Sequence, residues 1–231
     1  MTFGRGKLPS LSAALAGIPA AVQPSGPWTG RRQLFVQFAV EAETATIYTA
    51  DALRGELTRL AGRSRYHSVA IVGRDALAES EFLMAAFGQP GPLPVMLDHD
   101  GQRPSALEGL VSSLALVQVT LDGSEGSAAV ERACSSVALV AKKQVAHALV
   151  ILPTAQSSDG PLLRIVEQVH EASVDTQIVV HPLIELTKGY DRRWVHWLQE
   201  AMAVHADVRI LPRWPDRGPV PSDELHNGHS D

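Results

Sequence analysis

The sequence predicts an α/β fold on a parallel sheet, because short apolar runs rich in β-branched residues alternate with longer stretches of helical spacing. Most of the apolar runs are continuous Val, Ile and Leu, a pattern typical of strands that helices cover on their faces. Alternating strands and helices also imply right-handed crossovers between parallel neighbours. The predicted strands are 34–39, 68–72, 94–98, 116–121, 148–152, 177–181 and 208–211.

Helical spacing fills the stretches between these strands. In 51–62, Leu53, Leu57 and Leu60 share one face, and we expect Asp51 to cap the helix and Gly62 to end it. The other predicted helices are 76–87, 105–114, 127–143, 161–172 and 192–205. About six βα units are too many for a minimal doubly wound domain and too few for an eightfold barrel. The sequence therefore predicts a partial (β/α)6 TIM-like barrel, with a doubly wound open parallel sheet as the alternative.

The chain divides into one predicted domain and two irregular ends. Residues 34–214 have an ordinary length for a single α/β domain. Residues 1–33 are rich in Pro and Gly and predict a loosely structured lead-in, whereas 215–231 are Pro-rich and then polar, which predicts a disordered tail. No signal peptide is visible, and no apolar run reaches the roughly 18 residues that span a bilayer. We therefore expect a cytoplasmic protein with no membrane partner.

Composition removes several classes of function. The formal net charge is -5, from 20 Lys and Arg against 25 Asp and Glu, so we expect no nucleic-acid partner. The single cysteine excludes an internal disulfide and any zinc or iron–sulfur site that is built from several cysteines of this sequence. P-loop, G-x-G-x-x-G, G-x-S-x-G and H-E-x-x-H motifs do not occur.

Acidic and histidine side chains follow most of the predicted strands, where parallel sheets bind their ligands. They are Glu41, Glu43, Asp75, Asp98, His99, Asp100, Asp122 and His181, with the hydroxyl of Thr120 beside them. Asp98-His99-Asp100-Gly101 is either a turn or a source of metal ligands and acid/base groups. Glu41 and Glu43 are either solvated or a pair of carboxylates that holds a cation. His181 either bonds a backbone group or faces a ligand.

Several segments resemble one enzyme family in the family's own order. Residues 23–38 (QPSGPWTGRRQLFVQF) resemble the start of 7-carboxy-7-deazaguanine synthases, which are radical-SAM enzymes with the pattern S-x-Q-G-E-G-x-x-x-G-x-P-x-x-F-V-R there. Residues 67–77 resemble the family's second strand with its G-G-E-P loop, and 94–103 its third strand with an E-T-N-G-type turn. Further likeness lies at 116–122, 179–183 and 208–212. The resemblance implies a partial barrel and a homodimer.

The sequence departs from the family where the family's chemistry lies. The C-x3-C-x2-C motif, which binds a [4Fe–4S] cluster, corresponds here to Glu41, Ala45 and Tyr48. Without thiolates there is no cluster and no reductive cleavage of S-adenosylmethionine (SAM). The SAM-binding positions correspond to Gly73, Asp75 and Thr120. Arg74 between the first two would crowd the methionyl amine, so the sequence argues against SAM binding as well.

Two functional hypotheses follow. In the first, the chain is a cluster-less homologue whose barrel mouth is reused for non-radical chemistry on a purine-like or other polar metabolite. Its candidate catalytic residues are Glu41, Asp98, His99 and His181, and a divalent metal would bind Glu41, Glu43 and Asp100. In the second, the chain is a non-catalytic accessory subunit that binds a partner enzyme or a ligand.

Overall fold

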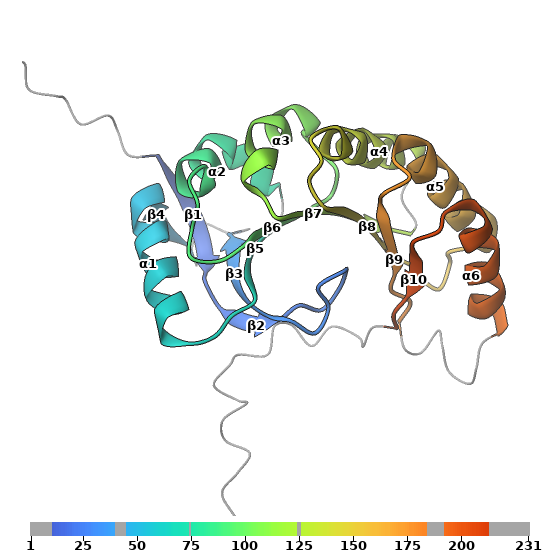
Figure 1. Cartoon of the computed structure of the whole chain (residues 1–231), viewed down its shortest axis with the longest axis horizontal. Coiled ribbons are helices and arrows are strands. Elements are labelled where there is room, and N and C mark those ends of the chain that lie inside the picture. Colours follow the sequence, from blue (N-terminus) through green and yellow to red (C-terminus); the bar gives the residue numbers. More distant parts are fainter. Residues whose placement is uncertain (1–10, 40–44, 74, 124–125, 184–191, 213–231) are drawn as a thin grey trace, which may run out of the picture.

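The chain has a mixed α/β fold with a mostly parallel central sheet and six helices in the part that the structure describes (Figure 1). The structure, a computed structural model, describes residues 11–39, 45–73, 75–123, 126–183 and 192–212. The tail predicted to be disordered, 215–231, and the first ten residues of the lead-in lie outside these ranges. Within them, no helix is both long enough and apolar enough to cross a membrane.

The parallel strands follow one another across the sheet in chain order. Each pairs in parallel with the next, and the order shows no reversal from β3 to β10. The predicted strands are confirmed, with bounds that differ by at most two residues. They are β3 (Arg32–Phe38), β5 (Ser68–Val72), β6 (Val95–His99), β7 (Leu116–Asp122), β8 (His147–Leu152), β9 (Gln177–Val180) and β10 (Val208–Ile210).

The helices also match the predicted pattern, and α2 to α6 cover the convex face of the curved sheet (Figure 1). Each helix packs beside the next, from α1 to α6. Their apolar faces bury one core against the first half of the sheet and a second core against β7 to β10. The helices are α1 (Ala50–Arg63), α2 (Ser80–Phe87), α3 (Pro104–Leu110), α4 (Ser127–Lys142), α5 (Asp159–Ala172) and α6 (Arg192–Val204).

The start of α1 differs from the prediction. Thr49 is the N-cap, and its Oγ1 accepts a hydrogen bond from the Ala52 amide at 3.2 Å, whereas Asp51 lies in the first turn. The helix also continues through Gly62 to Arg63. Asp51 still contributes a negative charge at the positive end of the helix dipole, so the acidic residue favours the helix without capping it.

The predicted lead-in forms regular structure that the sequence analysis missed. β1 (Ser12–Gly17) and β2 (Ala20–Val22) both pair antiparallel with β3 and are separated at Pro19. Pro19 cannot donate a hydrogen bond, but its carbonyl accepts one from Phe35 at 2.9 Å, so the proline interrupts the strand without detaching it. β4 (Thr46–Thr49) pairs antiparallel with β1 at the edge of the sheet.

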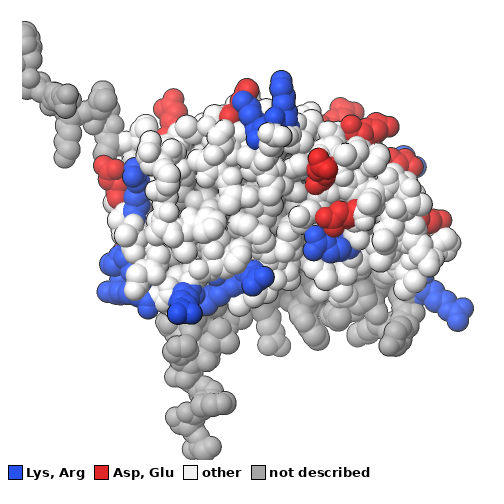
Figure 2. Space-filling view, in the orientation of Figure 1, with Lys and Arg blue, Asp and Glu red and all other residues white. Residues whose placement is uncertain are grey.

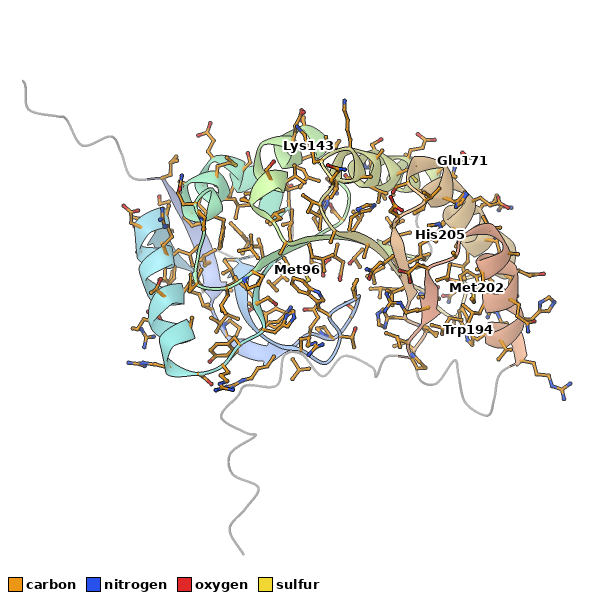
Figure 3. All side chains as sticks on the ribbon, viewed as in Figure 1. Met96, Lys143, Glu171, Trp194, Met202 and His205 are labelled. Atoms are coloured by element: carbon orange, nitrogen blue, oxygen red, sulfur yellow. The ribbon has the colours of Figure 1, made fainter. Side chains whose placement is uncertain are left out.

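The β2–β3 loop, residues 23–31, lies inside the concave side of the sheet (Figure 1). A small apolar cluster lies on this side, with Trp28 of the loop packed against it, and Met96 extends toward the loop (Figure 3). The buried members are Ala21, Phe35, Ala70, Met96 and Leu116.

In the view of Figure 2, basic side chains gather along the lower left edge, around α1 and β2. Acidic side chains are spread over the helices at the top and right of that view.

Candidate functional site

β6 and β7 place three polar side chains next to one another on the concave face. Asp98 lies opposite Gln118 in the parallel ladder, and Thr120 follows two residues later on the same face of β7. Thr120 Oγ1 donates to Asp98 Oδ1 at 2.7 Å, and Gln118 Nε2 donates to Asp98 Oδ2 at 2.9 Å. Both oxygens of the carboxylate are therefore held by donors from one neighbouring strand.

Burial changes the acidity of Asp98. The side chain is half-buried, and loss of solvent raises its pKa to about 6, although the hydrogen bonds from Thr120 and Gln118 act in the opposite direction. An ordinary aspartate is fully ionised at neutral pH. Asp98 instead has a significant protonated fraction just below neutral pH, so it can accept or donate a proton to a bound molecule there.

The β2–β3 loop joins this group to β9. The Gly26 amide donates to Nε2 of His181, just after β9, at 2.8 Å, and His181 is 1% exposed. Because Nε2 accepts, a neutral His181 ring carries its proton on Nδ1. A Cβ on Gly26 would lie 1.8 Å from Gln118 Oε1, so the glycine backbone lies directly against that oxygen. Asp98, Thr120 and His181 are thus linked through Gln118 and Gly26.

His99 and Asp100 do not join this group. Asp98 and His99 are consecutive in β6, so their side chains lie on opposite faces of the sheet. His99 is buried on the helix-covered side, its Nδ1 accepts from the Gly101 amide at 3.2 Å, and burial lowers its pKa to about 4. Asp100 bonds the backbone amide of Gln102 at 3.0 Å and its side-chain amide at 2.8 Å, which is a turn.

The positions that correspond to the family's SAM-binding loop are engaged elsewhere. Gly73 has a φ of +123°, and a Cβ there would lie 3.0 Å from the backbone nitrogen of Phe38. Asp75 forms a two-pronged ion pair with Arg103, at 2.6 and 2.8 Å, which lowers the pKa of the carboxyl. Among these positions only Thr120 belongs to the concave group, where it holds Asp98.

The residues at the positions that correspond to the cluster cysteines of 7-carboxy-7-deazaguanine synthases do not fit an iron–sulfur cluster. Tyr48 pairs with Ala13 in the β1–β4 ladder, and neither it nor Ala45 supplies a thiolate. The only cysteine of the sequence, Cys134, lies on α4 against the second core, and burial raises the pKa of its thiol. Glu41, the third corresponding position, lies outside the described residues.

A metal site is not evident in the residues whose placement is described. Among them, no three His, Cys, Asp or Glu side chains are grouped so that they could hold a metal ion. Glu41 and Glu43 lie outside the described ranges, so their pairing around a cation stays a prediction. Asp100, the third predicted ligand, is bonded within its own turn.

Sequence reasoning missed two residues that connect the group. Gln118 is fully buried within β7, and it is a polar residue inside an apolar run, LVQVTLD. That signal is readable in the sequence, because a buried amide requires hydrogen-bond partners. Gly26 could not be found in this way, because its partner His181 is 155 residues distant.

The fold and this group define an α/β protein with a polar, partly buried carboxyl on the concave face of a parallel sheet. Comparison with known proteins adds no family: no protein-family model matches the chain, and no curated protein matches it.

Proposed function

We propose that the concave face binds a small polar metabolite that is purine-like in its pattern of hydrogen-bond donors. Asp98 is the main residue that binds this metabolite, and it takes part in non-radical chemistry on it. The observation that carries this proposal is the Asp98 carboxyl, held by Gln118 and Thr120 near the carboxyl end of a parallel strand. Ligands of parallel α/β proteins bind at that end of the sheet. A half-buried acceptor suits ring N–H and amino donors of a heterocycle.

The proposal includes a partial (β/α)6 barrel and descent from a 7-carboxy-7-deazaguanine synthase-like ancestor. The unreversed strand order and the helices on the convex face support the barrel (Figure 1). The order of the resembling segments along the chain supports the ancestry. The chemistry would differ from the family's, because this sequence contains one cysteine and a site-differentiated cluster needs three.

Asp98 and His181 have different roles in the proposal, because their exposure and hydrogen bonds differ. Asp98 is half-buried and can face a ligand, whereas His181 is enclosed and already accepts a hydrogen bond from Gly26. We therefore assign the acid/base role to Asp98 and the role of positioning the loop to His181. His99 takes no part in the proposal, because it lies on the opposite face of the sheet.

The enclosure of His181 also favours a second candidate, a non-catalytic accessory subunit. A loop seated on the concave face leaves less room for chemistry and is compatible with a protein that binds a partner enzyme. Co-purification from native extract separates the two. An accessory subunit would elute with a second polypeptide, whereas a chain that elutes alone and binds a metabolite through Asp98 would support the first proposal.

Ligand binding tests the proposal directly. The chain would be screened by thermal shift against guanosine, a pterin, SAM and Mg²⁺, and the strongest ligand would be titrated by calorimetry. Asp98→Asn should weaken binding by about 10- to 100-fold, the size expected for one hydrogen bond to a charged group. Asp100→Asn is the matched control, because it makes the same chemical change in an exposed turn, and it should leave binding unchanged. No shift with any compound would contradict the proposal.

Reconstitution tests the exclusion of the cluster. After anaerobic incubation with iron and sulfide, we expect no brown absorbance and no stoichiometric iron, because the sequence lacks the three thiolates. A protein with about four irons per chain would contradict this part of the proposal.

A further inference from the structure

The β2–β3 loop occupies the place where a ligand of the proposed site would meet the sheet. Gly26 contacts both His181 and Gln118, and Gln118 is the residue that donates to the Asp98 carboxylate. Its amide gives His181 Nε2 the hydrogen bond that a ligand N–H could give. Its α-carbon lies against Gln118 Oε1, an oxygen that a ligand donor could otherwise reach.

The closed arrangement leaves one acceptor unsatisfied. Gln118 is fully buried, and its Oε1 has no hydrogen-bond partner among the described residues. The amide cannot simply be reversed, because Nε2 donates to the Asp98 carboxylate. A buried acceptor without a donor costs free energy, so the closed loop carries a penalty that a ligand with an N–H group would relieve.

The loop holds its own shape, and it contacts the sheet through Gly26 and Trp28. The Gln23 amide bonds the Arg31 carbonyl at 2.9 Å and the Gly30 amide bonds the Gln23 carbonyl at 3.0 Å, so the hairpin closes on itself. Besides Gly26, Trp28 packs on the apolar cluster of the concave face and edge-to-face on His67, with ring centroids 4.8 Å apart. A self-contained hairpin can leave the sheet as a unit without first losing its internal bonds.

We propose that residues 23–31 form a displaceable cover that inhibits the concave site by competing with its ligand for His181 and Gln118. The inference rests on the proposed function and adds its regulation. When the cover lifts, His181 Nε2 and Gln118 Oε1 both become accessible to a ligand, because Gly26 contacts both atoms in the closed arrangement. The apparent affinity for a ligand equals the affinity of the open form multiplied by the fraction of molecules in which the cover is open.

Two glycines of the same loop give a matched pair of variants. Gly26 and Gly30 have nearly the same φ, +84° and +82°, so alanine imposes the same backbone strain at either position. A Cβ at Gly26 would collide with Gln118, whereas a Cβ at Gly30 meets nothing within 4 Å. Gly26→Ala therefore forces the loop and the Gln118 side chain apart, and Gly30→Ala controls for the strain.

Hydrogen exchange with mass spectrometry and calorimetry with guanosine test the cover. We expect exchange in 23–31 to be about tenfold faster in Gly26→Ala than in Gly30→Ala, with exchange in α4 unchanged as a sign of an intact fold. If the cover is closed about nine-tenths of the time, guanosine should bind Gly26→Ala about tenfold more tightly than wild type.

The outcomes separate the cover from the proposed function. Unchanged exchange in 23–31, or equal guanosine affinity for wild type and Gly26→Ala while Asp98→Asn loses binding, would overturn the cover and leave the proposed function standing. Faster exchange in Gly26→Ala, with no binding of guanosine, the pterin, SAM or Mg²⁺ to any variant, would instead overturn the proposed function, and the cover's inhibitory role with it.

Discussion

Asp98 should make the protein less stable as the pH rises toward neutrality. Its pKa is raised from an ordinary 3.8 to about 6, chiefly by burial of the carboxyl. A group whose pKa is higher in the folded chain stabilises it fully below the unfolded pKa. That stabilisation is lost as the pH rises through the folded value. The window for Asp98 therefore extends from about pH 4 to just above pH 6.

The size of the effect follows from the two pKa values. They differ by about 2 pH units, and each unit corresponds to 1.36 kcal/mol, so ionising Asp98 costs the folded state about 3 kcal/mol. Asp98→Asn cannot ionise and keeps nearly the same shape. The variant should therefore gain about 3 kcal/mol relative to wild type between pH 4 and pH 7.5.

Urea unfolding of both proteins at half-unit pH steps measures this difference. Subtracting one curve from the other removes the contributions of other titrating groups, such as His99, that both proteins share. A difference between wild type and Asp98→Asn that changes by less than about 1 kcal/mol across this range would refute the idea that the carboxyl is desolvated.

Variants at four further positions test other parts of the structure. Thr49→Ala should lower the free energy of unfolding by about 1 kcal/mol in urea, because α1 loses the cap that bonds Ala52, and Thr49→Ser should retain most of it. Gly73→Ala should cost about 2 kcal/mol or more, since φ is +123° and Cβ meets the Phe38 backbone. Gly55→Ala, in open space within α1, should stabilise by about 1 kcal/mol. His99→Gln should lower the pH at which acid unfolds the chain. Burial takes the pKa of His99 from 6.5 to about 4, so wild type loses stability as the pH falls from 6.5 through about 4.

The parallel strands were predictable because the signal for each, a run of apolar residues, lies within the strand itself. β5 has the predicted bounds, and Val69–Val72 within it is an uninterrupted apolar run, since both faces of a central parallel strand are covered. β1 was missed because its stability comes from partners distant in the sequence, such as Phe38 opposite Leu15. The prolines of that region are local signals against a strand, and tertiary pairing overrode them.

The candidate site was predictable only in part, because the face of the sheet on which a side chain lies depends on where its strand ends. Asp98 and Thr120 belong together, as their places in neighbouring strands suggested. His99 was grouped with Asp98 by proximity in sequence, but β6 continues to His99, and the strand's alternation sends the two side chains to opposite faces. Gln118 was not predicted because it lies in the interior of β7, and the expected site residues lie at strand ends.

The central claim is that a small polar molecule binds to Asp98 on the concave face, and a crystal structure with the strongest thermal-shift ligand tests it most directly. We expect electron density for that ligand within hydrogen-bond distance of the Asp98 carboxyl, with residues 23–31 withdrawn from His181. A ligand bound elsewhere, for example in the groove between α2 and α3 lined by Met84, Ala106 and Gly109, with Gly26 still bonded to His181, would contradict the claim.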